Sequence, residues 1–230
     1  MRLRAAGCGR VGGMSLTDDL WSDIESIYAE ILEHPFVRGL TDGTLPRAAF
    51  RHFVEQDSLY LRDYARALAL CGARAPESAA LRAFVEDAVG ALAAEQEMLA
   101  GFGAELGDEP LRELVLPTTR AYTTHLLAAA YGGSYAEAVG AVLPCYWIYA
   151  RVGEHLVEKS SPDPLYARWI AAYGDEAFQS VVRRVLALTD ALGEEISPAE
   201  RRRTRECFVT SSRYEWMFWD AAWRGERWPV

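Results

Sequence analysis

The stretch LPCYWIYARVGEHLVE, from Leu143 to Glu158, predicts a helix in which a cysteine is surrounded by aromatic side chains. Cys145 and Tyr149 are four residues apart, so they project from one face of that helix. Tyr146 and Trp147 lie beside them, and an amphipathic run follows. A thiol on an aromatic wall is a candidate reactive centre.

Pro144 affects how that helix is built, because proline cannot donate a backbone hydrogen bond and its ring pushes away the carbonyl of Gly140. We expect the helix to kink or to restart there. If it restarts with Pro144 in the first position, Cys145 lies in the first turn, where free N–H groups and the helix dipole favour a thiolate. The alternative is that Cys145 is buried and acts as a small hydrophobic residue, which is the more common case.

Helical periodicity continues outward from this stretch in both directions. Capping signals and Gly or Pro breaks predict helices over residues 17–34, 44–71, 76–101, 118–131, 134–159, 165–172, 176–192 and 197–224. The first is expected to be capped by Thr17 or Asp18 and to end at His34 and Pro35. No window alternates with a period of two over the length of a strand, so the sequence predicts an all-α, bundle-like fold of roughly eight helices.

Residues 1–15 are rich in Arg and Gly without periodicity, so we expect a disordered tail, with Met14 as an alternative start. Residues 16–230 are expected to form one domain, because no linker interrupts them and they are long enough for one substantial core. No apolar run is long enough to cross a bilayer, which argues against a membrane partner.

Net charge and the spacing of Cys and His residues indicate which partners, compartment and metal sites to expect. The 24 Lys and Arg against 33 Asp and Glu give a net charge of −9, which argues against nucleic acid as a partner. The one dense basic run, Arg201 to Arg205, is interpreted as a solvated helix face. The four cysteines are widely separated and no secretory segment begins the chain, which indicates a reducing cytoplasm. The four histidines show no metal-ligand spacing, so we predict no metal site.

Two carboxylates interrupt apolar helix faces and need a physical reason, because an unpaired buried carboxylate is costly. Asp57 lies in EQDSLYL, with Tyr60 and Tyr64 along its face, and Glu215 lies in SSRYEWMFWDAAW, with Phe218 and Trp219 on its face. Taken singly, each carboxylate is better explained by a salt bridge, and the aromatic residues by core packing. Taken with Cys145, they come from three helices that can converge on one cavity.

Such a cavity suits a flat, nitrogen-containing ring held between aromatic side chains and gripped by carboxylates. A cysteine that adds to an electron-poor ring breaks its aromaticity, so a leaving group on an adjacent methylene can be expelled and replaced by water. A carboxyl group kept partly protonated by apolar surroundings supplies the proton to the ring nitrogen.

At these residues the chain resembles the thiaminase II (TenA) family. The matching motifs are QDSLYL from Gln56, AYTTHLL from Ala121, LPCYWIYARVGEHL from Leu143, YARWIAAYGDEAF from Tyr166 and SSRYEWMFWDAAW from Ser211. They occur in the family's order and cover nearly everything from Trp21 onward. Cys145 places the chain in the branch of the family that contains the cysteine.

The resemblance implies a haem-oxygenase-like all-α fold without haem or another cofactor, usually assembled as a homotetramer. It implies hydrolysis of a C–N bond in 4-amino-5-aminomethyl-2-methylpyrimidine, which gives the hydroxymethylpyrimidine of thiamine salvage; many members also cleave thiamine. Cys145 resembles the family's nucleophile, Glu215 the acid/base carboxylate at the ring nitrogen, and Asp57 the carboxylate that holds the aminopyrimidine. The pocket residues implied are Tyr60, Tyr122, Tyr149, Tyr173 and Phe218.

Two other functions remain open from the sequence. One is an oxygenase or oxidase of the same fold that uses a metal or quinone cofactor, which would need clustered His and carboxylate ligands. The other is a regulatory or scaffold protein that binds thiamine-like ligands without turnover. Pyrimidine binding without ammonia release would favour the second.

Overall fold

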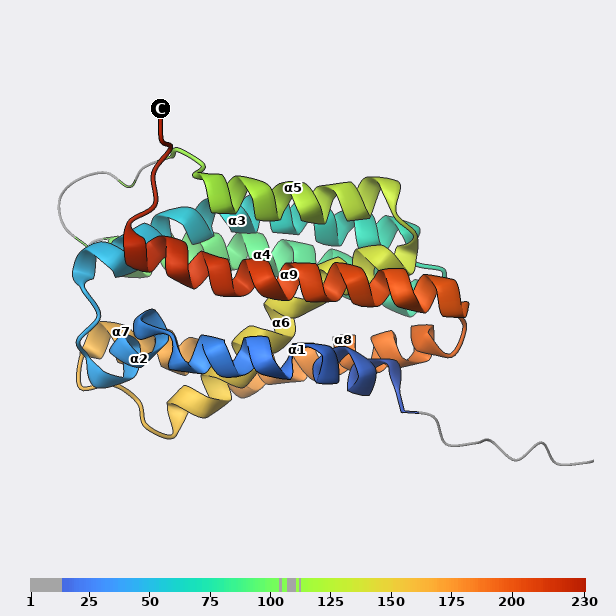
Figure 1. Ribbon diagram of the computed structural model, residues 1–230, viewed down its shortest axis with the longest axis horizontal. Helices are drawn as coiled ribbons and strands as arrows, with labels where there is room; N and C mark the ends of the chain where they lie inside the picture. Colours follow the sequence, from blue (N-terminus) through green and yellow to red (C-terminus); the bar gives the residue numbers. More distant parts are fainter. Residues whose placement is uncertain (1–13, 104, 107–110, 112) are drawn as a thin grey trace, which may run out of the picture.

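The computed structural model describes residues 14–103, 105–106, 111 and 113–230, and all regular secondary structure within them is helical (Figure 1). The helices are α1 (Leu16–Glu33), α2 (Pro35–Asp42), α3 (Arg47–Arg74), α4 (Ser78–Gly103), α5 (Pro117–Gly132), α6 (Tyr135–Val157), α7 (Pro164–Gly174), α8 (Glu176–Gly193) and α9 (Pro198–Arg224). The described residues contain no strand, which confirms the all-α prediction. None of the described helices is long and apolar enough to cross a membrane.

The helix that the sequence prediction missed is α2. His34 ends α1 and also caps α2, because its Nδ1 accepts a hydrogen bond of 3.1 Å from the Phe36 N–H. Pro35 takes the first helical position, where its missing N–H has no cost, and Gly43 ends the helix in the left-handed conformation with φ of 70°. One residue therefore both closes α1 and starts α2, at the point where we predicted only the end of a helix.

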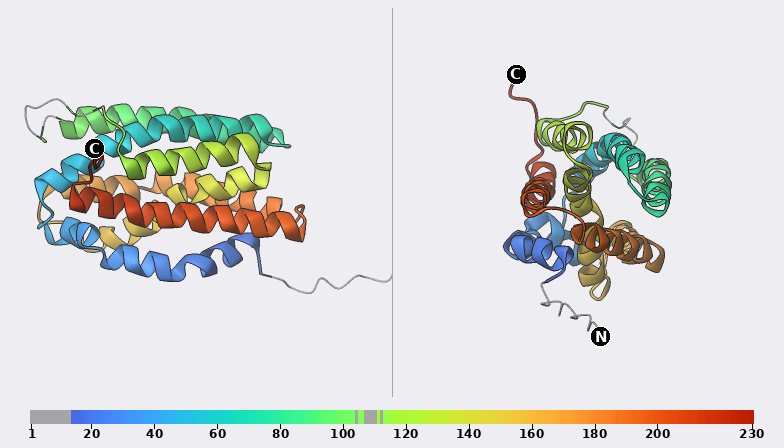
Figure 2. Two further views of the ribbon diagram at one scale, coloured as in Figure 1. Left: turned by 45° about the horizontal axis from the view of Figure 1, so that its top comes forward. Right: turned by 90° about the vertical axis from the view of Figure 1, so that its right-hand side faces the viewer.

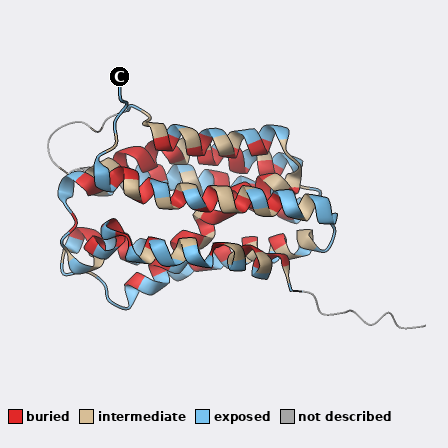
Figure 3. Cartoon of the chain, viewed as in Figure 1, coloured by how far each residue is buried: buried red, intermediate tan, exposed pale blue. Residues whose placement is uncertain are grey.

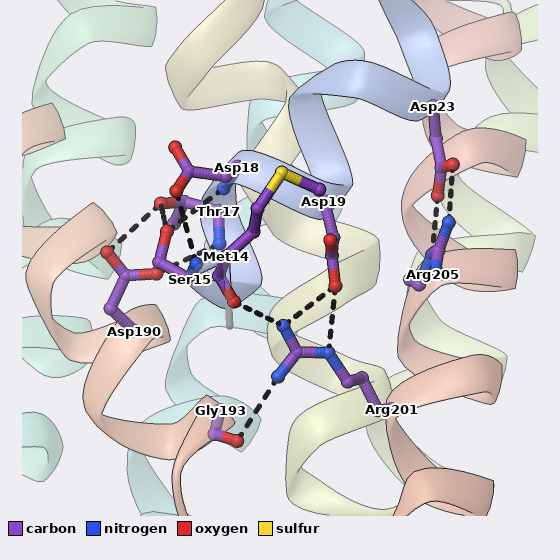
Figure 4. Close-up of polar contacts among 10 residues, drawn as sticks. All are labelled: Met14, Ser15, Thr17, Asp18, Asp19, Asp23, Asp190, Gly193, Arg201 and Arg205. Carbon is purple, nitrogen blue, oxygen red and sulfur yellow. Dashed lines mark hydrogen bonds and ion pairs between the residues drawn. The ribbon is translucent and has the colours of Figure 1, made fainter. Parts of the chain in front are cut away.

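The start of α1 also differs from the prediction. Ser15, rather than Thr17 or Asp18, caps the helix and forms a capping box with Asp18. Thr17 instead binds Asp190 of α8 through both its N–H, at 2.9 Å, and its hydroxyl, at 3.0 Å (Figure 4). Ser15 therefore belongs to the helical fold and not to a tail, whereas residues 1–13 lie outside the described part of the chain.

Only part of the dense basic run on α9 is the solvated face that the sequence indicated, because Arg202 and Arg203 are exposed whereas Arg201 and Arg205 pair with α1. Arg201 donates to Asp19 of α1 at 2.8 Å, and Arg205 forms a two-pronged pair with Asp23 one turn further along (Figure 4). The guanidinium group of Arg201 also donates to the Met14 carbonyl. These contacts join the first helix to the last.

The helices divide into two groups that α6 and α9 connect (Figures 1 and 2). On one side α3 packs against α4 and α5, and on the other α1, α2, α7 and α8 pack against one another. Both α6 and α9 contact members of each group, and they also contact each other extensively. Most of α6 is buried in the centre of the molecule (Figure 3), so side chains from both groups can meet around it.

Pro144 does not interrupt α6, which runs as one helix from Tyr135 to Val157. Of the two alternatives, a kink or a restart, the restart is wrong, and Cys145 lies in the middle of a helix instead of in its first turn. Packing explains the continuity. At Gly140 an added Cβ would lie only 2.6 Å from the Thr204 carbonyl oxygen of α9, so tight burial against α9 holds the segment helical although Pro144 lacks an N–H.

Candidate active site

The three reactive groups predicted from sequence lie on α3, α6 and α9 and converge on one place. Asp57 comes from α3, Cys145 from α6 and Glu215 from α9. The charges of Glu215 and Asp57 both raise the pKa of the Cys145 thiol, and Asp57 also raises the pKa of Glu215. Groups separated by up to 158 positions in the chain are therefore close enough to influence one another electrostatically.

Cys145 packs against the buried core beside the two carboxyl groups. It lies deep in the protein, yet its surface is partly exposed. Burial raises the pKa of the thiol well above its usual value, and the neighbouring carboxyls raise it further. The hydroxyls of Tyr60 and Tyr64 lower it, so they stabilise the thiolate when it forms.

Glu215 is 1% exposed and accepts a hydrogen bond of 2.5 Å from the Tyr122 hydroxyl of α5. Burial raises the pKa of Glu215 to about 8, although the Tyr122 hydrogen bond works in the opposite direction. The carboxyl is therefore largely protonated at neutral pH and can serve as an acid.

Asp57 is also buried, and burial raises its pKa to about 7. Its Oδ2 atom has no hydrogen-bond partner in the described part of the chain. Among the described residues, no basic side chain contributes to the pKa of Asp57 or of Glu215 and none forms an ion pair with either carboxyl group. The salt bridges that we considered for each carboxylate are therefore not found in this part of the chain. A buried, unpaired acceptor is costly unless a ligand completes it.

Aromatic side chains from five helices enclose these groups. Tyr60 lies 4.9 Å from Tyr122 and 5.8 Å from Phe218, measured between ring centroids. Tyr149 lies 4.9 Å from Tyr173, and the charges of Asp57 and Glu215 raise the pKa of both phenols after burial. All eight residues that we predicted for the site are therefore gathered around one centre.

Three residues of the wall were not among the predicted site residues. Tyr64 stacks on Tyr60 with a centroid distance of 5.4 Å, and its hydroxyl acts on Cys145. Its place seven residues after Asp57, on the same helix face, is a signal that could have identified it. Trp169 and Trp219 pack against Tyr149, and each buries an indole N–H that finds no acceptor among the described residues.

This site combines a thiol, two carboxyl groups that change protonation near neutral pH, and a wall of flat rings. Aromatic faces of this kind bind planar heterocycles, and carboxyl groups such as those of Asp57 and Glu215 hydrogen-bond to ring nitrogens and amines. A metal finds less support, because no three His, Cys, Asp or Glu side chains among the described residues are grouped as ligands.

The architecture is that of the haem-oxygenase-like all-α proteins. A solved domain from Shewanella denitrificans OS217, described as having a heme oxygenase-like fold, superposes with a TM-score of 0.72 at 16% identity and covers 93% of this chain and 94% of that one. The model of the TENA/THI-4/PQQC family matches residues 21–225, and the chain belongs to that family. The resemblance drawn from the five motifs is thereby confirmed.

Two relatives illustrate the relationship. The aminopyrimidine aminohydrolase of Bacillus subtilis (strain 168) is 36% identical over 198 residues, which cover 85% of this chain and 84% of the relative. The solved structure of a TenA homologue from P. horikoshii OT3 superposes with a TM-score of 0.83 at 33% identity, covering 92% of this chain and 100% of the homologue.

Proposed function

We propose that this protein is an aminopyrimidine aminohydrolase of the thiaminase II type. It hydrolyses 4-amino-5-aminomethyl-2-methylpyrimidine to the hydroxymethylpyrimidine and ammonia, in thiamine salvage. The observation that carries the proposal is the meeting of Cys145, Asp57 and Glu215 among aromatic side chains of five helices. Relatives named aminopyrimidine aminohydrolase, at 33–36% identity, support the same reaction.

In the proposed mechanism Asp57 holds the aminopyrimidine, and protonated Glu215 gives its proton to the ring nitrogen. The Cys145 sulfur bonds to the adjacent ring carbon, and the thiol proton leaves with the departing amine as ammonia. The ring electrons expel that amine from the methylene carbon. Water then adds its hydroxyl group to the methylene carbon and the C–S bond breaks. The other proton of that water returns to the Cys145 sulfur, and the ring-nitrogen proton returns to Glu215. The sum is one water consumed and one ammonia released.

Tyr residues support the two charges that develop in this sequence. The Tyr122 hydroxyl donates to Glu215, so it stabilises the carboxylate left after proton transfer. The hydroxyls of Tyr60 and Tyr64 stabilise negative charge on the Cys145 sulfur. The surrounding rings of Phe218, Tyr149 and Tyr173 form the walls of the pyrimidine pocket in this proposal.

Ammonia release from the aminomethylpyrimidine tests the proposal directly. We expect Cys145→Ala to abolish it and Glu215→Gln to lower kcat by about 10²- to 10⁴-fold. Cys207→Ala is the matched control, because Cys207 is also partly exposed but lies in a separate crevice beside His125 and Arg203. No ammonia from the wild-type protein would disprove the reaction, and full activity in Cys145→Ala would disprove the mechanism. Pyrimidine binding without turnover would indicate a binding protein instead.

Intact thiamine is proposed as a second substrate, because the pocket that holds the aminopyrimidine would accept the same ring in thiamine. Release of the thiazole alcohol from thiamine tests this. A preference for the aminopyrimidine would appear as a higher kcat/KM with that compound.

We also propose a cytoplasmic homotetramer that works without a nucleic acid or membrane partner. An exposed apolar stripe on α4, formed by Leu81, Val85, Val89 and Leu92, supports self-association. The net charge of −9 gives no attraction to nucleic acid. Light scattering that reports four times the chain mass of 25.6 kDa would support the assembly, and a monomer mass would refute it.

A further inference from the structure

Unlike α1, α6 and α9, helix α5 has no capping side chain at its own start. The residue in the N-cap position is Leu116, whose side chain accepts no hydrogen bond, and the first turn contains no acidic residue. The first N–H groups of an α-helix have no partner within the helix. The partners for this end of α5 must therefore come from elsewhere in the fold.

Two side chains from distant parts of the chain supply these partners. Glu226, which follows α9, accepts hydrogen bonds from the Thr118 N–H at 2.9 Å and from the Thr118 hydroxyl at 2.8 Å. Gln56 of α3 accepts from the Leu116 N–H and donates to the Leu114 carbonyl, both at 3.0 Å. A carboxylate at a helix N-terminus is also favoured by the positive end of the helix dipole. Glu226 therefore caps α5 from 108 positions away.

The way in which α9 ends directs Glu226 toward α5. Gly225 closes α9 in the left-handed conformation with φ of 61°. The N–H of Glu226 then donates to the Ala221 carbonyl at 2.9 Å, so the chain turns in a Schellman motif. Two residues later, the Trp228 indole N–H donates to the Val115 carbonyl at 3.1 Å. The segment after α9 is therefore fastened to the start of α5 at two points.

The helix face of α5 that Glu226 caps also carries Tyr122. Thr118 and Tyr122 are four positions apart, so they lie on one face of the helix, about 6 Å apart along its axis. Thr118 donates to Glu226 just beyond the end of α9, and the Tyr122 hydroxyl donates to Glu215 within α9 at 2.5 Å. A hydrogen bond between two oxygen atoms weakens once its length exceeds about 3.0 Å. A small displacement of the first turn of α5 is therefore enough to weaken the contact with Glu215.

We infer that Glu226 is a positioning residue, which caps α5 from beyond the end of α9 and thereby keeps the Tyr122 hydroxyl in contact with Glu215. The inference rests on the proposed function, in which Glu215 is the acid. Its consequence is that a partly buried residue outside the site influences the proton affinity of Glu215 without touching it. Gln56 supports the same end of α5, but it adjoins Asp57 in the chain, so Glu226 is the better residue to change.

The test follows the protonation of Glu215 directly, so it is informative whether or not the protein releases ammonia. Infrared spectra are recorded between about pH 5 and pH 10, and the carboxylic acid band of Glu215 is the one that Glu215→Gln lacks. His52, which lines the same crevice as Glu226, is retained in every Glu226 variant. So are the other titratable groups around Glu215, which are Asp57, Tyr60, Tyr122, Cys145, Tyr149 and Tyr173.

We expect the wild-type band to disappear with a midpoint near pH 8, because the pKa of Glu215 is raised to about 8. Glu226→Ala should raise this midpoint by about 0.3–1 unit, as Tyr122→Phe should, because a longer hydrogen bond from Tyr122 stabilises the carboxylate less. Loss of the negative charge alone would lower the midpoint, so the direction separates the two causes. Glu226→Gln loses the same charge but keeps an acceptor for Thr118, so its midpoint should lie below that of Glu226→Ala.

Asp18→Ala is the matched control, because it removes a carboxylate from the first turn of α1, a helix that carries none of the site residues. It should leave the midpoint unchanged. If Glu226→Ala does not fold, Thr118→Val replaces it and should give a smaller rise. A midpoint that stays or falls in folded Glu226→Ala would overturn the inference, and so would a rise of equal size when Glu226→Ala is combined with Tyr122→Phe. The expected rise, without ammonia release by the wild type, would establish the positioning and refute the reaction alone.

Discussion

At the scale of single residues, the proton affinity of Glu215 depends on two opposing effects. Burial raises the pKa of Glu215 to about 8, and the 2.5 Å hydrogen bond from Tyr122 lowers it. In the proposed mechanism Glu215 must be protonated in the free enzyme. We therefore expect kcat/KM to decline as the pH rises through about 8.

Tyr122→Phe removes the donor that stabilises the carboxylate and keeps the ring. The pKa of Glu215 should rise. The pH at which kcat/KM declines on the alkaline side should therefore increase by about one unit. Tyr214→Phe is the control, because Tyr214 stacks on Tyr122 at 5.3 Å without taking part in that hydrogen bond. A limb that stays in place, or moves downward, in Tyr122→Phe would show that Glu215 is not the acid.

At the scale of helices, the geometry of the site depends on how closely α6 and α9 approach. These helices carry Cys145 and Glu215, and they cross where Gly140 faces Thr204. A Cβ on Gly140 would lie 2.6 Å from the Thr204 carbonyl oxygen, which is backbone and has little freedom to move. Gly140→Ala should therefore separate the two helices.

We expect Gly140→Ala to lower the free energy of unfolding by about 1–3 kcal/mol and to reduce activity, because the two reactive groups move apart. Gly90→Ala on α4 is the matched control, since no atom lies within 4 Å of the added Cβ. It should stabilise the protein by up to about 1 kcal/mol with activity unchanged. Thermal unfolding and ammonia release measure both effects. A Gly140→Ala protein as stable and as active as Gly90→Ala would contradict the close crossing.

The helices themselves were predictable to different degrees. Ser197, Pro198 and Glu200 start α9 as their local pattern indicates, and the structure has Ser197 accepting from the Glu200 N–H. The errors arose where tertiary contacts decide. Pro144 predicts a break from its own chemistry, but packing keeps α6 continuous. At the start of α2, His34 is both the C-terminal cap of α1 and the N-terminal cap of α2. The periodicity of hydrophobic residues does not indicate this double role.

For the whole molecule, the sequence indicated which thiol and which two carboxyl groups lie together, but not their protonation. Periodicity placed Asp57 and Glu215 on apolar faces, and the motifs indicated that these faces meet. Whether each carboxyl is paired with a base depends on the side chains that fold around it, so the sequence favoured salt bridges that do not form. The contact of Glu226 with Thr118 is similarly invisible in the sequence, because it joins positions 108 apart in the chain.

The free energy of unfolding of the whole protein should be lowered by the buried, unpaired carboxylate of Asp57. Its pKa is raised from 3.8 to about 7 on folding. Below about pH 4 the carboxyl is protonated in both states and costs little. As the pH rises toward 7, the unfolded chain ionises first, so the folded state loses about 4 kcal/mol relative to low pH. Asn cannot ionise, so Asp57→Asn should avoid this loss.

We therefore expect Asp57→Asn to be more stable than the wild type at pH 8 by about 2–4 kcal/mol, and its activity to fall. The difference should shrink toward zero near pH 4. Thermal unfolding followed by circular dichroism at both pH values measures it. Asp63→Asn on the same helix is the control, since Asp63 pairs with Arg66 at the surface and its loss should cost at most about 1 kcal/mol. Equal stability of Asp57→Asn and the wild type at pH 8 would mean that a partner stabilises the ionised Asp57 carboxylate and offsets the cost of its burial.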